Sequence, residues 1–145
     1  MKRRWSSTGL ILAAGLVIGG FDVVSGSLWT GIGIFVFLLI AAVLVSPRAF
    51  PRPVTDEEAR EASSFDGRPI VYWRPGCPYC IRLRARLGRD ARRVLWVDIW
   101  ADPEGAASVR EVTGGDETVP TVIAGERSFV NPGVDVVRGL LSARA

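Results

Sequence analysis

The sequence predicts one α/β domain built on a mixed four-stranded sheet and preceded by two apolar helices. The first observation behind this prediction is that residues 1–45 are apolar, and their charged residues are only Lys2, Arg3, Arg4 and Asp22. Such a composition is typical of membrane-spanning sequence. The second observation is that strand-like and helix-like segments alternate from residue 68 onward, which is the pattern of an α/β fold.

The composition excludes several classes of protein. The chain has 145 residues, of which 48% are hydrophobic, so it is too apolar for an intrinsically disordered protein. Acidic and basic residues nearly balance after residue 45, and we therefore expect no nucleic-acid partner. With two cysteines and no histidine, one chain supplies too few ligands for a four-ligand zinc site, and we expect no bound metal.

Two apolar stretches, at about 8–26 and 28–45, are each long enough to cross a bilayer as a helix. A short turn at residues 25–27 joins them, so the region 1–45 is predicted to be a transmembrane hairpin in contact with lipid. Basic residues flank this hairpin at both ends and are absent from its turn. The positive-inside rule then places both termini and the following domain in the cytoplasm, as part of a multi-pass protein of the cell membrane.

Other interpretations of the N-terminal region stay open. A basic start followed by an apolar run also fits a secretory signal peptide, although no convincing A-x-A cleavage pattern lies near residues 25–27. A soluble buried hairpin would need apolar surface that the rest of the chain does not offer. An inverted arrangement, with the domain outside the cell, is disfavoured by Arg48 and Arg52.

Residues 46–67 are predicted to form a proline-rich linker and a short helix. The three prolines Pro47, Pro51 and Pro53 favour an extended chain. Thr55, followed three residues later by Glu58, has the form of a capping box, which predicts a helix over about 56–63. Because this helix is highly charged, we expect it to contribute little to a core.

The remaining segment, 68–145, reads as strands and helices in the order β-α-β-α-β-β-α. Its strands are recognised by β-branched and aromatic residues, and its second helix by a proline in the first turn. The predicted strands cover 69–73, 94–99, 118–124 and 127–130, and the predicted helices cover 78–89, 103–112 and 134–143.

Both cysteines of the chain lie in the motif Cys77-Pro78-Tyr79-Cys80, between the first predicted strand and the following helix. A cysteine at a helix N-terminus is stabilised as a thiolate by the exposed N–H groups. Arg74 adds a nearby positive charge. A strand followed by C-x-x-C and a helix predicts thiol–disulfide exchange. Two buried structural thiols, or half of an intermolecular metal site, are the alternatives.

This motif resembles that of the dithiol glutaredoxins, and the resemblance covers residues 68–142. A second match is Thr118-Val119-Pro120-Thr121, because the thioredoxin fold has a cis-proline facing the reactive cysteine. Within this family, Val97-Asp98-Ile99, the segment 114–121 and Asn131-Pro132 resemble actinobacterial mycoredoxins. The resemblance implies a thioredoxin/glutaredoxin fold.

The resemblance also implies a role for each residue of the site. Cys77 is expected to be the nucleophile and Cys80 the resolving thiol. The substrates would be disulfide-bearing proteins, with a small thiol and its reductase system as partners and no tightly bound cofactor. The expected substrate- and thiol-binding residues are Arg74, Tyr79, Thr118, Val119, Pro120, Gly133, Val134 and Asp135.

The identity of the small thiol is read from the segment 131–135. Glutathione-specific members usually carry a Gly-Gly pair followed by an acidic residue, whereas only Gly133 and Asp135 match that pattern here. Mycothiol, which has no γ-glutamyl arm, is therefore favoured over glutathione. Recycling by a flavin-dependent reductase, an iron–sulfur cluster in a dimer and a non-enzymatic adaptor are the alternative functions.

Overall fold

The structure is a computed structural model that describes residues 13–14, 17, 28–45 and 50–143. The chain divides into two compact units, Met1–Ala49 and Phe50–Ala145. We describe each unit by itself.

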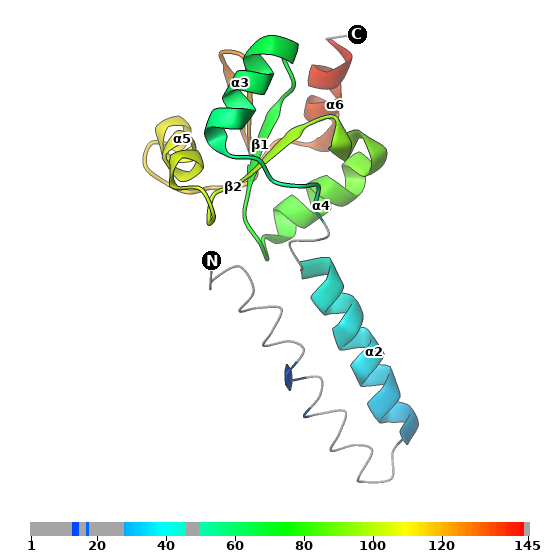
Figure 1. Cartoon of the computed structure of the whole chain (residues 1–145). Coiled ribbons are helices and arrows are strands. Elements are labelled where there is room, and N and C mark those ends of the chain that lie inside the picture. The colour runs from blue at the N-terminus through cyan, green and yellow to red at the C-terminus, as the bar shows by residue number, and fades with distance from the viewer. Residues whose placement is uncertain (1–12, 15–16, 18–27, 46–49, 144–145) are drawn as a thin grey trace. The chain divides into compact units, whose positions relative to one another are not determined.

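In the first unit, helix α2 (Leu28–Val45) lies where the sequence predicts the second apolar helix (Figure 1). The other predicted helix, at about 8–26, lies almost wholly outside the described residues. Among the residues that the structure describes, no helix is both long enough and apolar enough to cross a membrane.

The second unit is built on the predicted mixed four-stranded sheet. Its strands are β1 (Ile70–Trp73), β2 (Leu95–Asp98), β3 (Thr121–Ala124) and β4 (Arg127–Val130). The order across the sheet is β2-β1-β3-β4, with β1 parallel to β2 and the other neighbours antiparallel. Every residue of β1 and β2 is buried, so these two strands form the centre of the core.

Helices cover both faces of this sheet (Figure 1). One layer contains α3 (Asp56–Asp66) and α5 (Pro103–Thr113), which pack against each other. The other contains α4 (Pro78–Leu87) and α6 (Val134–Ser142), which also pack together. A short 3-10 helix, η2 (Gly88–Arg92), follows α4. The order β-α-β-α-β-β-α is confirmed, and it fits a thioredoxin/glutaredoxin fold.

Several boundaries differ from the sequence prediction for local reasons. Strand β3 begins at Thr121 rather than at residue 118, because the preceding Pro120 has no N–H to donate to a ladder. Helix α4 ends at Leu87, where Gly88 takes a positive φ of 58°. Helix α3 runs to Asp66, three residues beyond the prediction, and ends at a left-handed Gly67.

The chain that precedes β1 is part of the compact unit, which begins at Phe50 and not at residue 68. The ring of Phe50 stacks on Trp73, with 3.8 Å between centroids, and meets the edge of Trp96 at 5.3 Å. Val54 forms a parallel bridge with Val97. The segment predicted as a linker therefore contributes aromatic surface to the core and one residue to the edge of the sheet.

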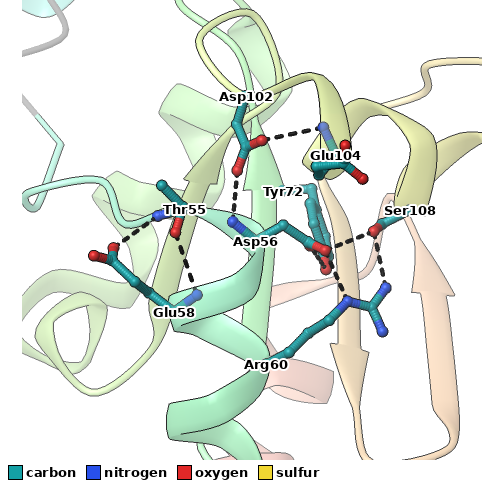
Figure 2. Close-up of polar contacts among 8 residues, drawn as sticks. All are labelled: Thr55, Asp56, Glu58, Arg60, Tyr72, Asp102, Glu104 and Ser108. Atoms are coloured by element: carbon teal, nitrogen blue, oxygen red, sulfur yellow. Dashed lines mark hydrogen bonds and ion pairs between the residues drawn. The ribbon is translucent and has the colours of Figure 1, made fainter.

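A polar cluster joins α3 to β1 and α5 (Figure 2). The carboxylate of Asp56 accepts hydrogen bonds from the Tyr72 hydroxyl at 2.6 Å, the Ser108 hydroxyl at 3.0 Å and the Arg60 Nε at 2.8 Å. The backbone N–H of Asp56 donates to the Asp102 carboxylate at 2.5 Å. The expectation that this helix offers little to the core is thus wrong, since its first residue is buried and hydrogen-bonded to β1, to α5 and to the N-cap residue of α5.

Candidate active site

The two cysteines lie at the start of α4, directly after the loop that leaves β1. Cys77 is the N-cap residue of this helix, and its sulfur accepts a hydrogen bond from the backbone N–H of Cys80 at 3.4 Å. Pro78 occupies the first helical turn, where a backbone donor is not needed. Both cysteines are free thiols, and Cys80 is completely buried while Cys77 is 6% exposed. The more accessible sulfur is therefore the one at the helix end.

The surroundings of Cys77 lower its pKa to about 6. The largest cause is a hydrogen bond from the Cys80 side chain, and the backbone N–H groups of Cys80 and Tyr79 and the charge of Arg74 act in the same direction. Burial opposes this shift. At neutral pH the Cys77 sulfur is therefore a thiolate, which is the nucleophilic form of cysteine.

The pKa of the Cys80 thiol shifts in the opposite direction. Its hydrogen bond to Cys77, its burial and the nearby negative charge of Cys77 all raise the pKa of the Cys80 thiol. Cys80 consequently stays protonated while Cys77 is ionised, and its proton stabilises the charge on its neighbour. The pair thus combines an ionised sulfur at the helix end with a protonated, completely buried thiol.

The loop before β3 faces the Cys77 sulfur. The peptide bond between Val119 and Pro120 is cis, and the Val119 carbonyl oxygen lies 3.5 Å from the Cys77 sulfur. The Pro120 carbonyl accepts a hydrogen bond from the Asn131 backbone N–H at 2.7 Å, and the Thr118 carbonyl accepts one from the Thr121 hydroxyl at 2.8 Å. These two hydrogen bonds fix the loop against the sheet on both sides of the proline.

An open cavity of about 1000 Å³ lies over the Cys77 sulfur. It is formed by the β1–α4 loop, the turn after β2 and the loop before β3. The predicted residues that line it are Arg74, Cys77, Tyr79, Thr118 and Val119. The cavity thus brings together the candidate nucleophile, a cation and the backbone that is expected to align a substrate.

A second, smaller cavity of about 200 Å³ lies next to the first, and Tyr79 lines both. Gly133 and Val134, at the start of α6, line the smaller cavity together with Arg82 and Arg86. Asp135 is exposed in the first turn of α6 and lines neither cavity.

Sequence reasoning missed three kinds of residue in the larger cavity. Trp100, Asn131 and the acidic pair Asp116 and Glu117 all line it. The place of Trp100 in the chain could have indicated that it lies at the site. Trp100 follows the strand that is parallel to β1, and the carboxyl ends of parallel strands meet at one edge of a sheet. The predicted site is at that edge.

The fold and this site together define a thiol–disulfide oxidoreductase with a dithiol centre. The sequence profile that describes glutaredoxin matches residues 70–129. Two sequences from Mycobacterium tuberculosis, of strains CDC 1551 / Oshkosh and ATCC 25618 / H37Rv, are both named "Putative glutaredoxin". Each is 38% identical to this chain over 74 residues, which cover 49% of this chain and 86% of the relative. No solved structure matches the chain.

The chain therefore belongs to the glutaredoxin family. The family match covers β1 to β4 and includes both cysteines and the loop before β3. It leaves out the segment from Phe50 to Asp66, which the structure shows to be part of the same compact unit.

Proposed function

We propose that this chain reduces mixed disulfides between proteins and a low-molecular-weight thiol. The observation that carries the proposal is the environment of Cys77. Its sulfur lies at a helix N-terminus, has a pKa of about 6 and borders an open cavity opposite the Val119 backbone. A protein substrate whose own cysteine pairs with that backbone would present its disulfide to the sulfur.

The first step of the proposed reaction is an attack by the Cys77 thiolate on the small-thiol sulfur of the mixed disulfide. The bond between the two substrate sulfurs breaks, the protein leaves as a thiolate that takes a proton from water, and Cys77 keeps the small thiol in a new disulfide. A second small thiolate then attacks that small-thiol sulfur. Its products are the symmetric small-thiol disulfide and the Cys77 thiolate, so no further oxidant or reductant is needed.

The buried Cys80 offers a second way to complete the cycle. After losing its proton, the Cys80 sulfur attacks Cys77, forms the intramolecular disulfide and releases the small thiol. Two further small thiols reduce this disulfide and are themselves joined as the symmetric disulfide. Because its pKa is raised, Cys80 competes poorly as long as small thiol is abundant.

We propose mycothiol rather than glutathione as the small thiol. The segment 131–135 departs from the pattern by which glutathione-specific members hold the γ-glutamyl carboxylate. Asp135, the acidic residue of that partial pattern, lines neither cavity. Without that group the site offers little that would select a γ-glutamyl arm.

Variants of the two cysteines test the proposal on a peptide joined by a disulfide to mycothiol or to glutathione. With Cys77→Ser, release of the reduced peptide should stop, and activity in this variant would refute the assignment of the nucleophile. With Cys80→Ser, small-thiol-dependent turnover should persist, and its complete loss would show an obligatory dithiol route. Faster turnover with glutathione than with mycothiol would overturn the choice of thiol.

The source of electrons needs a separate assay. We propose that the small thiol and its reductase recycle the protein. Oxidised protein is therefore incubated either with mycothiol and its reductase or with thioredoxin reductase, and consumption of NADPH is followed. Turnover supported only by thioredoxin reductase would favour the alternative redoxin that donates electrons to a partner protein.

We also propose, on the sequence alone, that residues 1–45 attach the domain to the cytoplasmic face of the cell membrane. Attachment would raise the effective concentration of the domain near a membrane-bound target. Cell fractionation should recover the full chain with membranes, and a membrane-impermeant thiol reagent should not label Cys77 in intact cells. Recovery in the soluble fraction would contradict attachment to the membrane, and labelling from outside would contradict the cytoplasmic location.

A further inference from the structure

Trp100 and the candidate nucleophile line the same cavity because of the register between strands β1 and β2. In the parallel pair β1–β2, Trp73 lies opposite Asp98, so the residues that follow both strands emerge at the same edge of the sheet. Arg74 leaves β1 there, and Trp100 leaves β2. The Cζ atom of Arg74 lies 5.9 Å from the centroid of the Trp100 ring. This is the distance of a cation–π contact.

The turn that carries Trp100 is fixed by its own hydrogen bonds. The Trp100 backbone N–H donates to the buried Asp98 carboxylate at 3.0 Å. The Asp98 carbonyl accepts from the N–H groups of Ala101 and Asp102 at 2.9 and 3.0 Å. These hydrogen bonds hold the backbone on both sides of Trp100 and so fix the point from which the indole reaches the arginine.

The contact between Arg74 and Trp100 matters because of the other charged side chains that line the cavity. Two carboxylates line the same cavity as Arg74, of which Glu117 is paired with Arg110 at 2.6 Å and Asp116 is exposed. Within the described part of the chain, Arg74 has no carboxylate within salt-bridge distance, and its recorded partner is the indole. A guanidinium stacked on an aromatic face has no negative partner to offset its field, whereas the field of one paired with a carboxylate would be largely cancelled by that negative charge.

We infer that Trp100 is a positioning residue, which holds the Arg74 guanidinium beside the cavity so that its positive charge acts on the Cys77 sulfur. The effect that we expect on turnover rests on the proposed function, whereas the effect on the ionisation of Cys77 does not. During thiol exchange one negative charge is shared by the attacking, central and leaving sulfurs. A cation fixed beside the cavity stabilises that charge throughout the step, and a cation free to swing into solvent does so only part of the time.

Replacing Trp100 tests this in the full-length protein. Alkylation of Cys77 with iodoacetamide is measured against pH, together with the second-order rate constant for reduction of hydroxyethyl disulfide, which is neutral. We expect Trp100→Ala to raise the pH midpoint of alkylation and to reduce the rate constant at neutral pH by a factor on the order of three, the size of an exposed cation–π contact. Trp100→Phe, which keeps an aromatic face, should restore the pH midpoint and the rate constant.

A double-mutant comparison separates positioning from a general structural effect. If Trp100 acts through Arg74, then Trp100→Ala should change neither quantity further in an Arg74→Ala background. The inference would be overturned if Trp100→Ala changed the alkylation midpoint and the rate constant in that background as much as it does in the wild type. It would also be overturned if the single variant left the pH midpoint of alkylation unchanged. Unfolding by guanidinium, followed in parallel, verifies that each variant is folded.

A matched control is available on β4. Arg127 lies 5.9 Å from the Phe129 ring, the same distance as in the pair at the site, and neither residue lines a described cavity. Phe129→Leu should leave the alkylation midpoint and the rate constant unchanged. Because alkylation needs no disulfide substrate, the midpoint tests Trp100 even if the wild-type protein fails to reduce mixed disulfides. Failure of the proposed function and failure of this inference are therefore distinguishable.

Discussion

The hydroxyl of Tyr72 donates a 2.6 Å hydrogen bond to the carboxylate of Asp56, which joins the first residue of α3 to the central strand β1. Burial, followed by this hydrogen bond, raises the pKa of Tyr72, so the phenol stays protonated and remains the donor. Ser108 and Arg60 complete the environment of the carboxylate (Figure 2). A segment outside the family match is thereby fastened to the sheet that carries the active site.

The first prediction concerns this polar cluster. Tyr72→Phe removes one hydrogen bond to a buried charge and should lower the free energy of unfolding by about 2 kcal/mol. Asp56→Ala removes the acceptor shared by three donors and should lower it by about 3 kcal/mol. Guanidinium unfolding followed by tryptophan fluorescence measures both. As a control, Ser64→Ala removes only an exposed hydrogen bond and should change stability by less than about 0.5 kcal/mol.

The second prediction concerns the aromatic contact before the sheet. Phe50 is 8% exposed and stacks on Trp73, so Phe50→Ala should lower the free energy of unfolding by about 3 kcal/mol. Phe65, which is 94% exposed, provides the matched control. If Phe50→Ala proved no more destabilising than Phe65→Ala, Phe50 would not contribute to the core as its burial indicates.

The third prediction compares two helical glycines. A Cβ at Gly105 in α5 would lie 2.6 Å from the Val97 side chain, so Gly105→Ala should destabilise the domain by about 2 kcal/mol. A Cβ at Gly139 in α6 would meet no atom within 4 Å, and Gly139→Ala should stabilise by up to about 1 kcal/mol because alanine favours a helix. Thermal unfolding of the two variants should therefore shift in opposite directions.

The fourth prediction concerns pH. The pKa of Cys77 is lowered to about 6 from an ordinary value of 9.0, so alkylation of Cys77 should rise with pH through about 6 and then level off. The same shift makes its contribution to folding stability complete above pH 9 and lost as the pH falls through 6. Cys80→Ala removes the largest cause of the shift, and the alkylation midpoint should rise while staying below 9 because the backbone donors remain.

An unchanged midpoint in Cys80→Ala would show that the backbone donors and Arg74 ionise Cys77 without help from the Cys80 thiol. Absorbance of the thiolate near 240 nm gives an independent measure, since Cys77 is the only remaining thiol in that variant.

The order of elements could be predicted because each carries a local signal. The strand at Ile70–Trp73 is β-branched and aromatic, and the helices that follow begin at a proline or a capping residue. The position of Cys77 at the start of a helix was also predictable, since Cys77 and Cys80 are close in the sequence and follow a strand. These features depend on neighbouring residues, which the sequence displays directly.

The parts that could not be predicted depend on contacts between distant residues. Nothing near Asp56 indicates that its carboxylate meets Tyr72 and Ser108, which lie 16 and 52 residues away. Phe50 lies between Pro47 and Pro51, so composition alone assigns it to a linker. The position of Trp100 beside Arg74 follows from strand register, which becomes evident only when Trp73 is paired with Asp98.

The bridge between Val54 and Val97 has a consequence for association between copies of the domain. In the order β2-β1-β3-β4 the outer strands are β2 and β4, and an unpaired outer strand invites pairing with another chain. On the β2 side, the Val54 N–H donates to the Trp96 carbonyl at 3.0 Å and occupies a position that a foreign strand would need. The segment before α3 therefore shields one rim of the sheet against intermolecular β-pairing.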